Sequence, residues 1–388
     1  MIPSALLLFC RILKSILFFA KAQKVKLKSC RNDFTRIYDN NKRYELFITS
    51  CIPGGTRSFT RNYLQNHFNT LVLYNISYGK DWAFILYNKD TDISTQLNIE
   101  DITNFLNSGC VSSIVLNTLV TNLHTFDFLK IIRESKLPAV VMIHDYYCVC
   151  PNFSLFTKGH NCDFQYCGSR FCFNNCNRFY IPRCSIQKWR ENWKNLLLSV
   201  NEVRCFSESS KEIVLKAYPH IPENKVTVIP HSMDYCSFTP VAYPKEPLHI
   251  GIVGAITSEH KGRNVVQQFL KFAKKNNILV SVIGSCNAFP KIRGKYINYT
   301  GAYKAQDLQT TIVREKVNAV LFPSLCSETF SYLVSEQMKM DLPIVCFDYG
   351  AQAEKVRAYR KGIICDSTEP EKIYEALLQA LRKGDEND

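Results

Sequence analysis

Several features are absent from this sequence, and each absence argues against a class of protein. Residues 1–33 contain no uncharged run longer than ten residues, whereas a membrane-spanning helix needs roughly 20 apolar residues. The basic residues there follow the first apolar run instead of preceding it, unlike those of a secretory signal peptide. No helix-turn-helix, RNP or zinc-finger spacing occurs, so nucleic acid is not an expected partner. Short internal repeats and low-complexity tracts are also absent.

The composition is that of a globular protein with room for two domains. The chain has 388 residues, of which 46% are hydrophobic and 21% charged. Its formal net charge of +14 suits phosphorylated sugars, nucleic acid or an anionic membrane face. The 17 cysteines are odd in number and irregularly spaced, which is not typical of a secreted disulfide framework. We therefore expect a reducing compartment, the cytoplasm.

Residues 1–43 form a basic and apolar N-terminal segment. Clusters of Leu, Ile and Phe alternate there with Arg11, Lys14 and further lysines. An interfacial helix with its lysines toward lipid phosphates is one interpretation, which would place the protein peripherally on the inner face of the cytoplasmic membrane. A helix packed on the core, or a remnant of a longer upstream region, explains the segment equally well.

The stretch Leu321–Phe347 predicts a strand, a polar loop, a helix and a second strand. The loop contains Glu328 and the helix contains Glu336. If the helix begins near Thr329, the two glutamates are separated by roughly 12 Å of rise and about 80° of turn. They are therefore spaced to contact two parts of one elongated ligand. The free N–H groups at such a helix start favour an anion such as phosphate, and we assign this role to Thr329, Phe330 and Ser331.

This stretch resembles the Glu-x7-Glu motif of retaining glycosyltransferases with the two-Rossmann GT-B architecture, especially family 4. The resemblance implies that Glu328 contacts the donor sugar, that Glu336 contacts the nucleotide ribose, and that the intervening backbone binds the diphosphate. A capped helix with an outward Glu336 is the structural alternative, because two glutamates eight residues apart are common.

The second predicted domain opens with the strand Leu248–Val253, followed by a loop that contains Gly254, Lys261 and Gly262. A fixed lysine beside backbone amides can neutralise a leaving nucleoside diphosphate without a metal. Members of the family show Gly-Arg and then Lys-Gly here, but Ala255 occupies the place of the arginine. Either Arg263 or a base from the first domain replaces it, or the phosphate is held more weakly.

Two features of the first predicted domain fit the same resemblance. Gly54 and Gly55 follow the strand Arg43–Ser50 and permit a tight turn close to a ligand, with Arg57 nearby. His144 ends the apolar run Val140–Ile143, where a parallel sheet binds its ligands. The resemblance implies sugar contact or proton handling for His144, whereas a structural histidine is the alternative.

The segment 148–184 concentrates cysteines, and we interpret it as an insertion in the first domain. The spacing Cys-x4-Cys-x4-Cys-x3-Cys lacks the paired Cys-x2-Cys arrangement of a firm zinc site, although four thiolates from one loop can reach a tetrahedral ion. A structural zinc and buried or free thiols both remain open. The candidate ligands are Cys162, Cys167, Cys172 and Cys176. The start of the segment also resembles an insertion in family 4 enzymes that build bacterial surface polysaccharides.

Alternating strand and helix signals predict an α/β protein with two Rossmann-like domains whose parallel sheets face an interdomain cleft. We expect an acceptor domain at 44–240, a donor domain at 241–382 and a polar tail at 383–388. The resemblance implies a retaining glycosyltransferase that uses a nucleoside-diphosphate sugar, needs no cofactor, and acts on a lipid-linked or glycan acceptor. The alternative is a catalytically silent GT-B-like binding or scaffold protein, which Ala255 favours.

Overall fold

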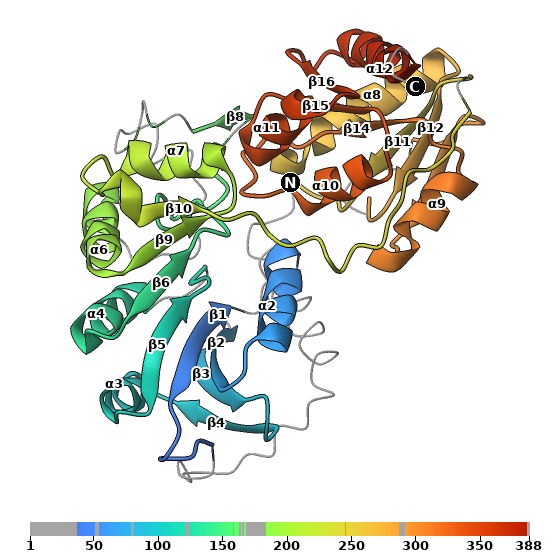
Figure 1. Ribbon diagram of the computed structural model, residues 1–388. Coiled ribbons are helices and arrows are strands. Elements are labelled where there is room, and N and C mark those ends of the chain that lie inside the picture. Colours follow the sequence, from blue (N-terminus) through green and yellow to red (C-terminus); the bar gives the residue numbers. More distant parts are fainter. Residues whose placement is uncertain are drawn as a thin grey trace. The chain divides into compact units, whose positions relative to one another are not determined.

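The computed structural model describes residues 37–50, 54–78, 81–120, 124–157, 159–162, 164, 167, 184–244, 246–286 and 292–385. Contacts divide them into two compact units, each built around its own large sheet (Figure 1). The first unit takes its described residues from Met1–Pro151, Arg178–Arg204 and Tyr218–Thr227. The second takes them from Asn152–Asn177, Cys205–Ala217 and Val228–Asp388. The boundaries that we expected between acceptor and donor domains stay a prediction.

Parts of several predictions lie outside the described residues. These are residues 1–36 of the basic and apolar N-terminal segment, residues 158, 163, 165, 166 and 168–183 of the cysteine-rich insertion with the candidate ligands Cys172 and Cys176, and residues 386–388 of the polar tail. Of the helices that can be described, none combines the length and the apolar character that crossing a membrane requires.

The first unit contains a mixed sheet with the strand order β10-β9-β6-β5-β1-β2-β3-β4. Strands β2, β1, β5, β6 and β9 run parallel, as the alternating pattern predicted. Strands β3 and β4 extend the sheet in antiparallel fashion, which was not predicted. The strand bounds are β1 Tyr44–Ser50, β2 Thr70–Tyr78, β3 Asp81–Asn88, β4 Ile93–Leu97, β5 Val111–Leu116, β6 Ala139–Met142, β9 Glu202–Cys205 and β10 Val226–Val228.

Helices of the first unit cover this sheet and complete its core. Trp189 of α6 is fully buried, and its indole N–H donates to the Tyr147 carbonyl at 2.9 Å. Helix α2 has no fully buried residue, but Tyr63 packs on Phe47 of β1 with ring centroids 4.8 Å apart. The helix bounds are α2 Gly55–Asn66, α3 Ile99–Asn107, α4 Thr125–Ser135, α6 Ile186–Ser199 and the 3-10 turn η2 Glu223–Lys225.

The second unit contains a fully parallel sheet with the strand order β13-β12-β11-β14-β15-β16. Numbered within the unit, this order is 3-2-1-4-5-6, that of a doubly wound Rossmann sheet. The strands are β11 His249–Val253, β12 Leu279–Ile283, β13 Ile297–Gly301, β14 Ala319–Phe322, β15 Ile344–Phe347 and β16 Gly362–Cys365. A two-stranded sheet of β7 Phe156–Thr157 and β8 His160–Asn161 accompanies it.

Helices cover both faces of the second sheet, because successive side chains of its strands point to opposite faces. Ile250 and Ile252 of β11 pack with α8 and α12, whereas Val253 packs with α9 on the other face. Helices α10 and α11 pack together on the face of α9 (Figure 1). The bounds are α7 Glu208–Ala217, η3 Glu259–Lys261, α8 Arg263–Lys275, η4 Ala305–Asp307, α9 Leu308–Arg314, α10 Tyr332–Lys339, α11 Gly350–Ala358 and α12 Pro370–Asp385.

The strand order changes direction between β11 and β14 of the second unit. Chain connections leave these neighbouring strands toward opposite sides, which opens a crevice beyond their carboxyl ends. The loop after β11 contains Gly254 and Lys261, and the loop after β14 contains Glu328. The fold therefore places these predicted site residues at its topological switch point.

Candidate functional site

Two loops of the second unit meet at this switch point. Gly262 has φ of 78°, and a Cβ at this position would lie 1.9 Å from the carbonyl oxygen of Pro323. The Leu325 amide also donates to the His260 carbonyl at 2.9 Å. Since only glycine permits this approach, Gly262 joins the loop after β11 to the loop after β14.

Lys261 and Glu328 form an ion pair across the two loops. The Lys261 Nζ lies 2.6 Å from the Glu328 Oε1, and the side chains are 40% and 15% exposed. Burial is the largest single effect and opposes both charges, but nearby charge and hydrogen bonding, chiefly within the pair, together outweigh it, so the pKa of Lys261 is raised and the pKa of Glu328 is lowered. Both groups are therefore ionised at neutral pH, and the lysine stays open to a ligand.

The backbone around Glu328 is held by α11, which the sequence analysis did not anticipate. The fully buried Gln352 accepts from the Glu328 amide at 3.1 Å and donates to the Cys326 carbonyl at 2.7 Å. Gly350 has φ of 53°, and a Cβ there would lie 2.7 Å from the Glu328 nitrogen. No local pattern marks Gln352, because its partners lie more than 20 residues earlier in the chain.

The prediction that the next helix begins near Thr329 is wrong. Helix α10 begins at Tyr332, after Ser331, which has φ of 60° and ψ of 79°. This left-handed conformation is unusual for serine and cannot continue a helix. The free N–H groups of the first turn therefore start at Tyr332. Thr329 and Phe330 belong to the preceding loop, whose Thr329 carbonyl accepts from the Ser210 hydroxyl at 3.3 Å.

Glu336 points away from solvent rather than outward. It is 6% exposed, and its Oε1 accepts from the Tyr235 hydroxyl at 2.8 Å. Burial raises the pKa of Glu336, while the hydrogen bond from Tyr235 lowers it. The structural alternative of an outward glutamate is therefore wrong. Tyr235 was not predicted, because it lies 101 residues before Glu336.

Lys355 of α11 is a further cation, close enough to Glu328 for that charge to affect its pKa, and the sequence analysis missed it. Ala255 is exposed, and the neighbouring Gly254 has φ of 119° and lies against Leu333 of α10. Arg263 contacts Asn264 at 3.4 Å, and no ion pair of its side chain occurs among the described residues. Lys355 instead lies over the ring of Phe330, 3.2 Å from the centroid. Burial lowers the pKa of Lys355 to about 7.

The predicted residues of the first unit gather around α2. Gly54 has φ of 115°, which glycine tolerates, and its carbonyl accepts from the Arg57 amide at 3.1 Å; Gly55 begins α2. His144 lies beyond the end of β6, and its ring packs on Phe59 of α2 at 4.5 Å between centroids. Burial lowers the pKa of His144 to about 3, so the imidazole is neutral at neutral pH.

The prediction of a metal site at the four cysteines stays untested. Within the part of the chain that can be described, no group of three or more His, Cys, Asp or Glu side chains is arranged to hold a metal ion. Cys162 and Cys167 are described and partly exposed, but the other two candidates are not described.

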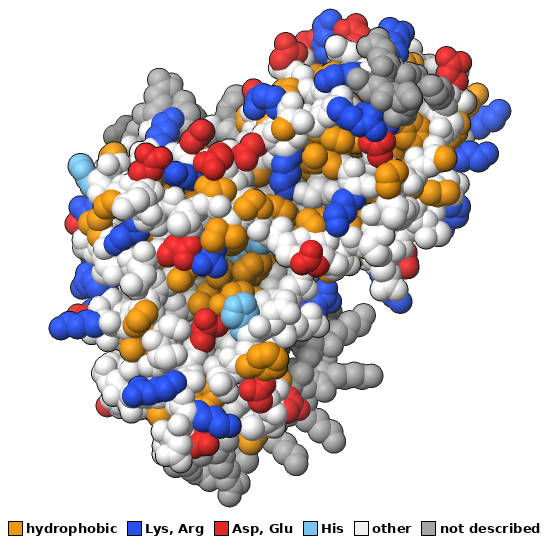
Figure 2. Space-filling view, viewed as in Figure 1, with side chains coloured by type: hydrophobic (Ala, Val, Ile, Leu, Met, Phe, Trp, Pro, Cys, Tyr) orange, Lys and Arg blue, Asp and Glu red, His pale blue; other side chains and the backbone are white. Residues whose placement is uncertain are grey.

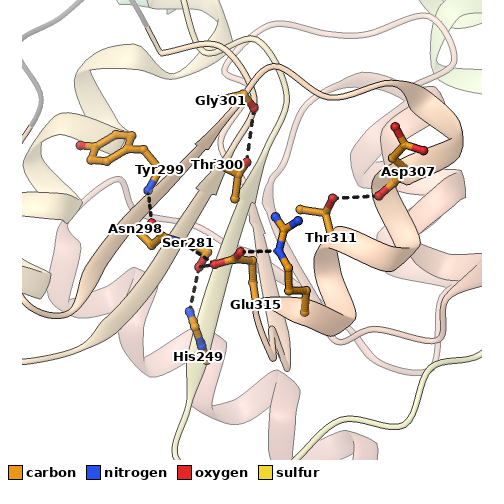
Figure 3. A network of polar contacts seen from close by, with 10 residues as sticks. His249, Ser281, Asn298, Tyr299, Thr300, Gly301, Asp307, Thr311 and Glu315 are labelled. Carbon is orange, nitrogen blue, oxygen red and sulfur yellow. Dashed lines mark hydrogen bonds and ion pairs between the residues drawn. The ribbon is translucent and has the colours of Figure 1, made fainter.

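A second polar network in the second unit contains Ser, His and Glu but does not form a hydrolytic triad (Figure 3). His249 Nε2 lies 3.0 Å from the Ser281 Oγ, and Ser281 donates to Glu315 at 3.1 Å. A triad requires the carboxylate on the histidine and an accessible serine. Here the carboxylate contacts the serine, which is fully buried. The network therefore links β11, β12 and the end of α9 structurally.

Comparison with known proteins adds three structural likenesses. Sucrose-phosphate synthase from Thermosynechococcus elongatus is 12% identical with a TM-score of 0.58, covering 89% of this chain and 94% of that chain. Anabaena HepE in complex with UDP is 11% identical with a TM-score of 0.57 and the same coverage. The lipopolysaccharide outer core galactosyltransferase WaaB is 13% identical with a TM-score of 0.52, covering 89% and 98%.

The fold is GT-B. The predicted fold class is thereby confirmed. Residues 247–383 also match the model of the family described as Glycosyl transferases group 1. No curated protein sequence matches the chain. The matched part of this GT-B chain includes Lys261, Glu328 and Glu336, together with the complete sheet of the second unit.

Proposed function

We propose that this protein is a glycosyltransferase that moves a sugar from a nucleoside-diphosphate donor to a hydroxyl acceptor. The observation that carries the proposal is the ion pair of Lys261 and Glu328 at the switch point of the second sheet. The pair lies inside the region that matches the group 1 family model. HepE, which shares the fold, is described in complexes with UDP and with UDP-glucose, and this supports a nucleotide-sugar donor.

In the proposed reaction, the bond between the anomeric carbon and the diphosphate oxygen breaks while the acceptor oxygen bonds to that carbon. Lys261 and the N–H groups at the start of α10 neutralise the charge that develops on the leaving diphosphate. Glu328 orients the sugar, and Glu336 accepts a hydrogen bond from the ribose. The acceptor proton passes to the leaving phosphate, and the new bond forms on the same face, with retention. His144 contacts the sugar or takes part in the proton transfer.

The acceptor is proposed to be a lipid-linked or glycan hydroxyl in cell-surface polysaccharide or glycolipid synthesis. WaaB, named as a lipopolysaccharide galactosyltransferase, supports this class, as does the basic N-terminal segment 1–43. Peripheral contact with the inner face of the cytoplasmic membrane would bring the enzyme to such an acceptor. Figure 2 shows Lys and Arg side chains scattered among acidic ones on the visible face, without one dominant basic patch. We assign membrane contact to the N-terminal segment because its lysines and apolar clusters suit a lipid surface.

A catalytically silent GT-B protein is the second candidate, because Ala255 stands where the family has an arginine that holds phosphate. Such a protein would bind the donor without turning it over. Lys355 is a candidate for the missing charge, since burial lowers its pKa to about 7 and an anion nearby would restore its proton.

The test is thermal stabilisation and donor hydrolysis across a panel of nucleotide sugars. We expect one donor to raise the melting temperature of the native protein and to be hydrolysed. Lys261→Met and Glu328→Gln should lose both responses. Lys372→Met is the matched control, because Lys372 pairs with Glu375 at 2.9 Å on the exposed surface of α12.

Each outcome decides between the candidates. Stabilisation without hydrolysis, even with acceptor glycans present, would favour the silent protein. No stabilisation by any donor would refute nucleotide-sugar binding. Equal donor responses in native protein, Lys261→Met and Glu328→Gln would refute the site assignment.

A further inference from the structure

A tight turn of the second unit brings a tyrosine onto the carboxylate of Glu336. The Cys236 amide donates to the Met233 carbonyl at 2.9 Å, which closes the turn and puts Tyr235 at its tip. The Tyr235 hydroxyl donates to Glu336 Oε1 at 2.8 Å. The turn thus supplies a hydrogen-bond donor to a buried carboxylate on a helix that is distant in sequence.

The turn is fastened to α10 by a lysine from the same helix. Lys339 Nζ donates to the Met233 carbonyl at 3.0 Å and to the Cys236 carbonyl at 2.9 Å. Lys339 lies three residues after Glu336, so both side chains occupy the same face of α10. Tyr235 is therefore held in place at both ends of its turn. A tyrosine fixed in this way loses little entropy when it donates its hydrogen bond.

Only one oxygen of the carboxylate is used in this arrangement. Among the described residues, the Tyr235 hydroxyl is the one hydrogen-bond donor to Glu336, and it bonds to Oε1 and not to Oε2. A carboxylate has capacity for more than one hydrogen bond, so Oε2 can accept from a ligand while Oε1 stays bonded. Tyr235 is 39% exposed, so its ring is partly accessible to solvent while Glu336 is buried.

Other groups around Glu336 leave its charge without a cationic partner. Burial and the charge of Glu336 raise the pKa of Tyr303 and of Tyr332, so these phenols are neutral. The ammonium group of Lys339 donates to the two carbonyls of the turn and makes no ion pair with Glu336 among the described residues. A buried carboxylate without a hydrogen bond would favour its protonated form.

We propose that Tyr235 is a positioning residue that fixes Glu336 through Oε1, so that Oε2 is ready to accept a ribose hydroxyl of the donor. This role rests on the proposed function, because it gives Glu336 a nucleotide to contact. The positioning role depends on the hydroxyl of Tyr235, so a phenylalanine at this position would lack it.

The first experiment compares the native protein with Tyr235→Phe in steady-state kinetics on the donor that stabilises the protein. We expect KM for the donor to rise about five- to thirty-fold. This increase is smaller than the one that would follow if the full energy of a hydrogen bond to a charged group were lost from donor binding. Since the ribose is remote from the reacting carbon, kcat should change less than twofold, the pattern of lost uniform binding.

The pH dependence separates positioning from a general structural effect. The Tyr235 hydrogen bond lowers the pKa of Glu336, so its removal raises that pKa. The acid limb of donor affinity should therefore move to higher pH in Tyr235→Phe. Carbon-13 NMR of the Glu336 carboxyl, assigned with Glu336→Gln, measures the same shift in protein without donor.

The controls distinguish the failure of this inference from the failure of the proposed function. Tyr359→Phe removes a similar bond, from the Tyr359 hydroxyl to Asp341 at 3.0 Å, and should leave KM unchanged. In Glu336→Gln, the further change Tyr235→Phe should add little, because the two residues act as one unit. If native protein turns over a donor but Tyr235→Phe matches it in KM and pH profile, only the role of Tyr235 is overturned. Absence of donor binding to native protein would overturn both.

Discussion

Gln337 of α10 offers a stability test of the way this helix is packed. Its side chain is fully buried, and neither its Nε2 nor its Oε1 has a hydrogen-bond partner among the described residues. An amide removed from water without compensation destabilises a fold. We therefore expect Gln337→Met, which keeps the length and volume of the side chain, to stabilise the protein.

The expected magnitude follows from the desolvation of one amide. An unsatisfied buried polar group costs about 1–3 kcal/mol, and a volume-conserving swap introduces strain of less than about 1.5 kcal/mol. We expect a net gain of about 1–2 kcal/mol. For a unit of this size, each kcal/mol corresponds to roughly 2–4 °C in melting temperature.

The assay is thermal and urea unfolding of Gln337→Met beside Gln352→Met. Gln352 is equally buried, but its Oε1 accepts from the Glu328 amide and its Nε2 donates to the Cys326 carbonyl. Gln352→Met should therefore destabilise by about 2–4 kcal/mol, since it leaves two backbone groups unpaired. If both substitutions destabilise equally, the Gln337 amide must have partners such as internal water, and the reasoning is refuted.

Two further predictions concern a glycine and a histidine. Gly262→Ala should destabilise the protein by more than about 3 kcal/mol. Gly301 has the same φ of 78° but nothing within 4 Å of a Cβ at its position, so Gly301→Ala should cost about 1 kcal/mol. Equal losses of stability in chemical denaturation would contradict the close approach of Gly262 to Pro323. His144→Asn should become more stable relative to the native protein as the pH falls from 7 to 4. The reason is that the pKa of His144 is lowered from 6.5 to about 3, so the unfolded chain binds the proton first and native stability is lost. Burial raises the pKa of Asp145 to about 6, which acts in the opposite direction in both proteins. The measurement is the melting temperature of both proteins from pH 7 to 4. If the two melting temperatures change in parallel with pH, His144 is solvated and the reasoning is wrong.

Local patterns in the sequence were sufficient for most elements of the second unit. The apolar run Leu248–Val253 predicted a strand, found as β11 at His249–Val253. The strand, helix and second strand predicted within Leu321–Phe347 are found as β14, α10 and β15. Such runs identify buried parallel strands because both faces of the sheet are covered, so every side chain is apolar. The polar residues that follow them then mark the carboxyl ends where ligands bind.

Some elements could not be read from local patterns. Strand β4, Ile93–Leu97, was missed because its centre is polar and only Leu97 is fully buried. It pairs with β3 at the edge of the sheet, where only one side of its backbone is paired within the sheet. The start of α10 was placed three residues early, because serine gives no signal of the left-handed conformation that Ser331 adopts.

The sequence by itself determined the strands, their helices and the polar positions at the strand ends, since these depend on the periodicity of burial along a few residues. Only the tertiary structure decided which of those positions meet. Lys261 and Glu328 are 67 residues apart, and Tyr235 and Glu336 are 101 residues apart. Their contacts depend on the order of β11 and β14 in the sheet and on the turn fastened to α10. Those are long-range properties, because they arise from the packing of whole elements and leave no trace in the spacing of neighbouring residues.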